Sequence, residues 1–278
     1  MLRTAARGKT VHTQVNGITI AYSDQGTGLP IVFLHAFPMN RTMWAAQKNA
    51  LSSQFRIITI DLRGHGESDA PLGRYTLDQS ADDVSALLDH LAIPQAVFAG
   101  LSMGGYILLA FYRKYADRVK GLILADTRAQ ADTVEGKDGR FQMAQTAYTN
   151  GPSAIADLMI PKILSPVTIQ TKPDLVQQVR AMIEGNQISG ITGDLMAMAE
   201  RPDSVPLLAQ ITCPTQIIVG ELDQGTPPSD AKLMAEKIPG ARLAIIPNAA
   251  HMTNLERPDA FNQIVGSFAS ELAKKMKH

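Results

Sequence analysis

The pentapeptide Gly100-Leu101-Ser102-Met103-Gly104 has the residue types and the spacing that place a nucleophilic serine on a sharp turn, and it is the only G-x-S-x-G match in the chain. A short apolar strand pattern (Ala96–Ala99) precedes it and a helical pattern (Tyr106–Tyr115) follows it. This is the strand–turn–helix setting that the motif requires. Glycine at both flanks suits a strained serine backbone, because a Cβ there would collide with the neighbouring strand or helix. The sequence therefore predicts covalent catalysis by Ser102.

A serine hydroxyl is a weak nucleophile at neutral pH, so it needs a general base beside it. The chain has six histidines, of which three lie in loops that follow strand patterns: His35, His65 and His251. His251 comes just after the last strand pattern. Functional loops of open α/β sheets lie at the carboxyl ends of the strands. We therefore expect His251 to be the base.

The base in turn needs a carboxylate that orients its imidazole ring. Asp223 follows the strand pattern Thr215–Val219, and the chain order Ser102, Asp223, His251 is one of the orders known for such triads. Asp126 also follows a strand pattern and could reach the same imidazole from one strand earlier. We expect Asp223 to be the orienting acid, with Asp126 as its competitor.

Acyl transfer also needs N–H groups aimed at the oxyanion that forms on the substrate. The first candidate is the backbone N–H of Met103, at the start of the helix after the serine, where the helix dipole favours negative charge. The second should come from the loop after the third strand pattern, His35-Ala36-Phe37-Pro38. We expect the Phe37 N–H to fill that role and His35 to support the loop.

The remaining motifs point away from metals and cofactors. The segment Asp61–Ser68 is rich in glycine but matches neither G-x-x-x-x-G-K-[ST] nor G-x-G-x-x-G, so we expect a tight turn held by Arg63 and Asp61 rather than a phosphate site. The chain has no H-E-x-x-H motif, no histidine cluster and no calcium loop, and Cys213 is its only cysteine. We therefore expect no metal and no cofactor.

Short apolar runs alternate with helical patterns over most of the chain. Most of the runs lack polar alternation, which is typical of strands covered on both faces. They are Ile18–Tyr22, Ile31–His35, Arg56–Asp61, Ala96–Gly100, Lys120–Asp126, Thr215–Glu221 and Arg242–Pro247. The clearest helical pattern is Thr76–Leu91, which has one apolar face and aspartates in its first turns. The alternation predicts a mostly parallel sheet with helices on both faces.

The alternation stops between Asp126 and Ile211. This stretch has six prolines and no convincing strand pattern. Its helix-like pieces are Asp138–Tyr148, Ser153–Leu164, Pro173–Glu184 and Thr192–Glu200. It is too long for a simple connection and predicts a helical cap over one end of the sheet. We therefore expect a core made of residues 1–126 and 211–278, which ends in a helix over Pro258–Lys275, and a cap made of residues 127–210.

Composition excludes several classes of partner. Basic and acidic residues number 26 each, so the chain lacks the excess of basic charge that binds nucleic acid or an anionic membrane. Ile93–Tyr112 is 20 residues without a charge, but glycines interrupt it, so we expect a strand, a turn and a helix rather than a membrane span. The single cysteine fits a reducing compartment, and residues 1–10 lead into a strand pattern rather than the apolar core of a signal peptide. We expect a cytoplasmic protein with a small-molecule substrate, and homo-oligomerisation stays open.

Together these segments resemble the α/β-hydrolase superfamily over essentially the whole chain. The matching residues are His35–Pro38, Asp61–Ser68, Gly100–Gly105, Gly220–Asp223 and His251 with Asn254–Pro258. The resemblance implies a mostly parallel eight-stranded sheet flanked by helices, with a helical cap inserted between the sixth and seventh strands. Within the superfamily the chain is similar to bacterial carboxylesterases and 3-oxoadipate enol-lactonases, and less closely to cofactor-free haloperoxidases.

Two positions depart from the family pattern. Ala36 stands where the family usually has glycine after histidine, which reduces the backbone freedom of the oxyanion loop. Phe37 stands where haloperoxidase-like members carry tryptophan, and the only tryptophan here is Trp44, which weakens the perhydrolase alternative. Ser102 argues against the haloalkane dehalogenases and epoxide hydrolases, because relatives of that kind carry an aspartate nucleophile.

The resemblance implies hydrolysis of small to medium carboxylic esters through an acyl-enzyme intermediate. The main alternative is an enol-lactonase, which would need a cation for the carboxylate of its substrate; the candidates are Arg128, Arg140, Lys162 and Arg180. A ligand receptor built on the same fold is an alternative from another class. The methionines and aliphatic residues of the cap offer adaptable apolar surface, so we expect the cap to select the substrate.

Overall fold

Eight strands form one sheet in the order β1-β2-β4-β3-β5-β6-β7-β8 in the computed structural model, which describes residues 10–275. The strands are β1 (Val11–Val15), β2 (Ile18–Gln25), β3 (Pro30–Leu34), β4 (Arg56–Ile60), β5 (Ala96–Leu101), β6 (Val119–Ala125), β7 (Thr215–Gly220) and β8 (Arg242–Ile246). The pairs β1–β2 and β2–β4 are antiparallel, and the other five are parallel. Residues 1–9, the site of the expectation about a signal peptide, lie outside the described range.

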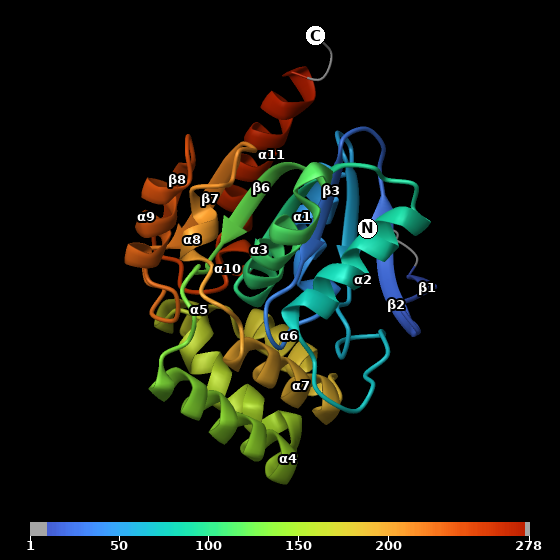
Figure 1. Cartoon of the computed structure of the whole chain (residues 1–278). Coiled ribbons are helices and arrows are strands. Elements are labelled where there is room, and N and C mark those ends of the chain that lie inside the picture. Colours follow the sequence, from blue (N-terminus) through green and yellow to red (C-terminus); the bar gives the residue numbers. More distant parts are fainter. Residues whose placement is uncertain (1–9, 276–278) are drawn as a thin grey trace, which may run out of the picture.

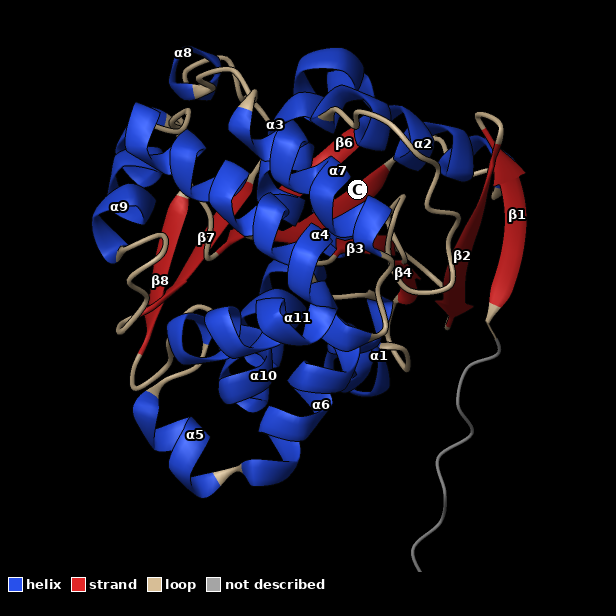
Figure 2. Ribbon diagram, turned by 90° about the horizontal axis from the view of Figure 1, so that it is seen from below, coloured by secondary structure: helices blue, strands red, loops and turns tan. Residues whose placement is uncertain are grey.

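Helices cover both faces of the sheet (Figure 1). The core helices are α1 (Ala45–Leu51), α2 (Leu77–His90), α3 (Met103–Tyr115), α9 (Pro228–Lys237), α10 (Thr253–Glu256) and α11 (Pro258–Lys275), with short 3₁₀ turns at Arg41–Trp44 and Ala116–Arg118. Figure 2 shows α2, α3 and α9 on one face, and α1 and α11 on the other. Strands β5 and β7 are buried along their whole length, as expected for strands covered on both sides. The predicted fold class, a mostly parallel sheet flanked by helices, is confirmed.

Five helices lie between β6 and β7 in the chain, and the first four of them lie at the end of the sheet shown lowest in Figure 1. They are α4 (Val134–Ile163), α5 (Pro166–Thr171), α6 (Pro173–Glu184), α7 (Ile188–Ala199) and α8 (Val205–Leu208). The first of these joins the two separately predicted helices across a kink at Gly151, whose φ is +79°. It begins earlier than predicted because the side chain of Thr133 caps it by accepting from the Gly136 N–H.

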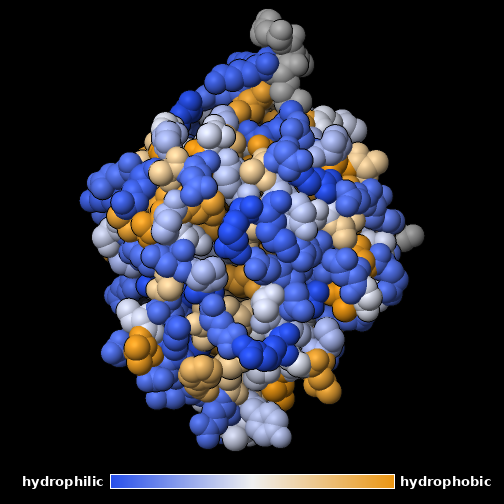
Figure 3. Space-filling model, in the orientation of Figure 1, coloured by the Kyte–Doolittle hydropathy of each residue, from blue (hydrophilic) through white to orange (hydrophobic). Residues whose placement is uncertain are grey.

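The uncharged stretch Ile93–Tyr112 contains β5, the turn at Ser102 and most of α3, as predicted. None of the helices within residues 10–275 has the length and apolar character needed to cross a bilayer. The face seen in Figure 3 is largely hydrophilic, with apolar residues scattered over it. Three of the exposed apolar residues lie seven positions apart on α4: Val134, Phe141 and Tyr148.

The turn after β4 is held differently from the expectation. Asp61 is fully buried and pairs with the guanidinium of Arg41, not with Arg63. It also accepts the backbone N–H of Arg41 at 2.7 Å and of Glu67 at 2.9 Å. Arg63 instead pairs with Asp83 on α2 at 2.7 Å. The expectation that Arg63 and Asp61 hold this turn is confirmed for Asp61, whereas the side chain of Arg63 is bound to α2, a contact between segments that are distant in the sequence. The carboxylate of Asp61 in fact joins the loops that follow β3 and β4.

Candidate active site

Ser102 occupies the turn between β5 and α3 with a backbone that few residues other than glycine adopt, at φ +54° and ψ −113°. Its N–H donates to the carbonyl of Ala125 at 2.9 Å, and its own carbonyl accepts from the Gly105 N–H and from the Thr127 hydroxyl. A strained conformation persists only where its surroundings fix it. These contacts fix the turn and leave the side chain of Ser102 partly exposed.

The predicted serine, histidine and aspartate lie in one hydrogen-bonded row. His251 Nε2 lies 2.9 Å from Ser102 Oγ, and His251 Nδ1 lies 2.8 Å from Asp223 Oδ2. With Nδ1 protonated toward Asp223, Nε2 is free to accept the proton of the serine hydroxyl. The structure therefore brings together the three residues that the sequence predicted, although Ser102 and His251 are 149 positions apart in the chain.

The competing carboxylate, Asp126, lies nearby but is bonded elsewhere. Its Oδ1 accepts the Gly220 N–H at 2.8 Å, and its Oδ2 bonds to the hydroxyl of Thr253. No hydrogen bond joins it to His251 among the described residues, so the geometry favours Asp223 as the orienting acid. Asp126 instead connects two segments of the site. These are the end of β7 at Gly220, shortly before Asp223, and Thr253, shortly after His251.

Asp223 is kept charged by its neighbours. Burial raises the pKa of Asp223, but the charge of His251 and its hydrogen bond, together with donors from Thr226, lower it by more, so the net pKa lies below the ordinary range. The donors are the Thr226 N–H at 3.0 Å and its hydroxyl at 2.7 Å, and the Gly225 N–H adds a contact at 2.9 Å. An ionised carboxylate at this position can hold His251 and stabilise its protonated form.

The loop after β3 is fixed from below by a buried histidine. His35 is fully buried, and its Nε2 accepts the Leu62 N–H at 3.0 Å. Burial and the neighbouring His65 hold the pKa of His35 well below 6.5, so its imidazole is neutral and can accept. The supporting role expected for His35 agrees with these contacts. Neither the Phe37 N–H nor the Met103 N–H has a hydrogen-bond acceptor within residues 10–275, which leaves both free for an oxyanion.

Sequence reasoning missed two residues that hold the row in place. Thr226 was overlooked, although it lies only three positions after Asp223. Glu256 is fully buried and accepts the Ala250 N–H at 2.8 Å, next to His251. Its other oxygen accepts the Ser165 N–H at 3.0 Å and the Thr168 hydroxyl at 2.6 Å, from the segment after α4. Glu256 lies within the segment Asn254–Pro258 that carried the family resemblance, and this was the one signal that could have found it.

The candidate cations of the cap region are mostly paired. Arg140 pairs with Asp132, and Arg180 pairs with Asp157 and Glu184. Arg128 donates to the carbonyl of Gly225, in the loop that carries Asp223. Of the methionines proposed to contact substrate, Met182 and Met198 are buried, and Met143, Met159 and Met196 pack partly buried against the core.

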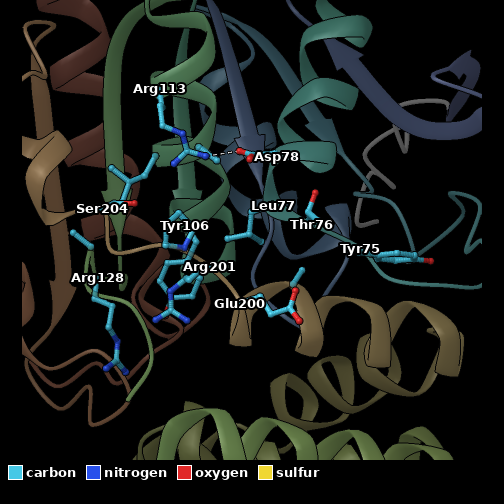
Figure 4. Close-up of a pocket in the computed structure, with 15 residues that line it drawn as sticks. Tyr75, Thr76, Leu77, Asp78, Tyr106, Arg113, Arg128, Glu200, Arg201 and Ser204 are labelled. Atoms are coloured by element: carbon cyan, nitrogen blue, oxygen red, sulfur yellow. Dashed lines mark hydrogen bonds and ion pairs between the residues drawn. The ribbon is translucent and has the colours of Figure 1, made fainter. Parts of the chain in front are cut away.

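A separate cavity of about 160 Å³ lies between α2, α3 and the segment after α7 (Figure 4). Its lining residues include Leu77, Tyr106 and Arg201, and the ion pair of Arg113 with Asp78 lies at its edge. Ser102, Asp223 and His251 are not among them. This cavity is therefore separate from the hydrogen-bonded group of Ser102, His251 and Asp223. No group of three or more His, Cys, Asp and Glu residues within residues 10–275 could hold a metal ion.

Comparison with known proteins shows the family of this chain. Residues 30–258 match the model of the alpha/beta hydrolase fold family. The chain belongs to the α/β-hydrolase family. A curated relative from Acinetobacter baylyi, 3-oxoadipate enol-lactonase 2, is 31% identical over 92% of this chain and 94% of its own length.

Solved structures of this family superpose closely on this structure. A thermophilic esterase from Thermogutta terrifontis is 40% identical, with a TM-score of 0.92 over 95% of this chain and 99% of its own. The enol-lactonase from Burkholderia xenovorans LB400 is 32% identical, with a TM-score of 0.88 over 94% of this chain and 100% of its own. The family predicted from the motifs is thus confirmed, and the α/β hydrolases that this chain resembles in shape include an esterase and an enol-lactonase.

Proposed function

We propose that this α/β hydrolase is a serine carboxylesterase that cleaves small to medium carboxylic esters through an acyl-enzyme intermediate. The observation that carries the proposal is the row Asp223–His251–Ser102, with contacts of 2.8 Å and 2.9 Å on the two nitrogens of one imidazole. Relatives named as esterases and enol-lactonases support carboxylic ester bonds as the class of bond cleaved.

In the first half-reaction Ser102 Oγ attacks the ester carbonyl while His251 Nε2 takes the serine proton. The carbonyl oxygen becomes an oxyanion, which the N–H groups of Phe37 and Met103 stabilise. Collapse of this intermediate breaks the bond to the alcohol, which leaves with the proton held by His251. Asp223 stabilises the imidazolium throughout.

In the second half-reaction a water molecule attacks the acylated Ser102, and His251 takes its proton. The second oxyanion forms at the same two N–H groups and collapses to release the carboxylic acid. Ser102 recovers its proton from His251. These side chains and one water balance the reaction, so the proposal involves no cofactor.

A second candidate is an enol-lactonase, favoured by the relatives of that name and by Arg128, whose guanidinium donates to Gly225 beside Asp223. An anionic lactone needs a cation near the triad. Arg128 itself lies 3.7 Å from a carboxylate oxygen of Asp230, and Arg140 and Arg180 make closer contacts with carboxylates. We also propose that residues 127–210 act as the cap that selects the substrate. A cytoplasmic location and homo-oligomerisation stay predictions from the sequence.

Steady-state hydrolysis of p-nitrophenyl esters from acetyl to dodecanoyl tests the proposal. We expect turnover with short chains, a fall with acyl length, and a loss of at least about 10³-fold in kcat for Ser102→Ala. Asp223→Asn should lower kcat by about 10⁴-fold, because the imidazole of His251 would take the wrong tautomer. Asp126→Asn should lower kcat by a smaller factor. No turnover by the parent protein, or equal turnover by Ser102→Ala, would overturn the proposal. Turnover of an anionic enol-lactone alone would favour the second candidate.

A further inference from the structure

A side chain of the cap region reaches the loop that follows β3. Asn186 lies in the connection between α6 and α7 and is 4% exposed. Its Nδ2 donates to the carbonyl of Pro38 at 2.6 Å and to the carbonyl of Met182 at 3.0 Å, and its Oδ1 accepts the Gly66 N–H at 2.9 Å. Two acceptors and one donor around the amide leave only one orientation that satisfies all three contacts.

Pro38 directly follows Phe37, whose N–H is the proposed oxyanion donor. Beneath this loop, His35 holds the Leu62 N–H, and the carbonyl of Ala36 accepts the Met39 N–H at 2.8 Å. Within residues 10–275, Asn186 makes the only hydrogen bond from the cap region, residues 127–210, to residues 35–38. Without this hydrogen bond, no polar contact would hold residues 35–38 to the cap region.

The second loop that Asn186 contacts, at Gly66 after β4, is also constrained. Gly66 has φ +58°, and a Cβ built there would lie 2.3 Å from the carboxylate of Asp61. That carboxylate ties Arg41 to Glu67 from the core side. Asn186 ties Pro38 to Gly66 from the cap side, so the loops after β3 and β4 are joined twice. A loop clamped on both sides holds its N–H groups in fixed directions, which oxyanion stabilisation requires.

We propose that Asn186 is a positioning residue for the oxyanion hole, and that the cap region thereby tunes the chemical step without touching the reacting atoms. The inference rests on the proposed function, because it takes the Phe37 N–H as an oxyanion donor. Loss of the Asn186 amide would let Pro38 and Phe37 shift, and the ester oxyanion would lose part of its stabilisation.

The test compares p-nitrophenyl acetate with its thionoacetate analogue, in which sulfur replaces the carbonyl oxygen. Sulfur is larger and a weaker acceptor, so the ratio of oxygen-ester to thionoester rates measures how well the site fits an oxyanion. Asn186→Leu keeps the number and branching of the side-chain heavy atoms and removes every hydrogen bond of the side chain. We expect kcat for the oxygen ester to fall about 10- to 100-fold, with the rate ratio falling in parallel and KM changing little.

Ser189→Ala is the matched control, because Ser189 also bonds the cap region to the core, at Ala70 and away from the oxyanion loop, at 3.1 Å. It should leave the rate ratio unchanged. If Asn186→Leu does not fold, Asn186→Asp keeps the acceptor for Gly66, loses the amide donor to Pro38, and should lower the ratio as well. A ratio equal to that of the parent, or an effect on KM alone, would overturn the inference. A parent without Ser102-dependent turnover would overturn the proposed function instead.

Discussion

The imidazole of His251 lies almost enclosed between groups that act on its charge in opposite directions. Burial lowers the pKa of His251, but the charge of Asp223 and its hydrogen bond raise it, with a smaller contribution from Asp126. The net pKa lies above 6.5, although the positive charge of Arg128 opposes the rise. A base of this kind binds its proton strongly enough to hold it between the two proton transfers of each half-reaction.

We expect kcat/KM for p-nitrophenyl acetate to rise with pH along an acid limb whose apparent pKa lies above about 6.5, because only neutral His251 accepts the serine proton. Initial rates from about pH 5 to about pH 8 measure this limb. Arg128→Gln removes a charge that lowers the pKa, so its limb should lie at still higher pH. A limb at or below the ordinary histidine value would contradict the electrostatic account.

At the scale of the element, the turn between β5 and α3 depends on close packing that only glycine permits. A Cβ on Gly100 would lie 2.4 Å from the carbonyl oxygen of Gly104, and one on Gly104 would lie 2.3 Å from the carbonyl oxygen of Leu34. The predicted steric reason for both glycines is confirmed. The atoms in the way belong to the backbone of α3 and β3, so they cannot swing aside as a flexible side chain could.

Gly104→Ala should therefore displace the start of α3, and with it Ser102 and the Met103 N–H. We expect a loss of about 10²-fold in kcat, the effect of a misplacement of about 1 Å, and a loss of about 1–3 kcal/mol in unfolding free energy from overpacking. Steady-state kinetics and urea unfolding measure the two effects. Gly139→Ala is the control: no heavy atom lies within 4 Å of its Cβ, so α4 should gain about 0.5–1 kcal/mol. Equal behaviour of the two variants would refute the packing argument.

Patterns within short segments of the sequence were enough to predict the strands of the parallel region, each of which matches a predicted apolar run. Ser102 was predicted from its motif and His251 from the loop after the last strand, and the structure places the two side chains in hydrogen-bond contact. The order of residues alone could not separate Asp223 from Asp126, because both follow adjacent parallel strands and differ only in which donors surround them.

Contacts between distant segments could not be predicted. Asp61 bonds to Arg41 rather than to its neighbour Arg63, and Asn186 reaches Pro38 over 148 positions. Such pairs depend on how the loops and the cap region meet in space, and a single sequence has no local signal for that. The sequence predicted two helices within α4, and the backbone indeed leaves helical geometry between them, at Gly151 with φ +79° and ψ 178°.

At the scale of the whole molecule, the seam between the core and residues 127–210 buries an acid beside an imidazole. Asp194 of α7 and His65 of the loop after β4 are both fully enclosed, with 3.4 Å between Oδ2 and Nδ1. Burial raises the pKa of Asp194 to about 8 and lowers the pKa of His65 to about 4. At neutral pH the contact is therefore between two uncharged groups and is not an ion pair.

These pKa values predict how stability depends on pH. Between about pH 4 and pH 6.5 the two groups change the unfolding free energy in opposite directions as pH rises. Asp194 is protonated in the folded chain and ionised in the unfolded chain, whereas His65 is neutral in the folded chain and protonated in the unfolded chain. Between about pH 6.5 and pH 8 only Asp194 of these two groups contributes, and the raised pKa of His251 adds a decline of the same sign. The contribution of Asp194 to the unfolding free energy should then fall by about 1.4 kcal/mol per pH unit, which is roughly 2–4 °C of Tm for each kcal/mol.

Asp194→Asn should make the decline above about pH 6.5 shallower, leaving the part due to His251, and should leave the rise between about pH 4 and pH 6.5 that His65 produces. Thermal unfolding at a series of pH values measures both limbs, and the exposed Asp174→Asn serves as the control. If the variant and the parent lose Tm in parallel above pH 6.5, the seam is not the origin of the decline.

The pairing of β6 with β7 across the whole of residues 127–210 has a consequence for when the protein becomes active. Ser102 precedes this insertion, whereas Asp223 and His251 follow it. Parallel strands so far apart in the chain can pair only after the long segment between them has closed, and contacts of such separation form late. During synthesis the proposed nucleophile is therefore made first, and its proposed base and orienting acid reach it only when β7 and β8 join the edge of the sheet. Under the proposed function, we therefore expect hydrolytic activity to appear only when assembly is nearly complete.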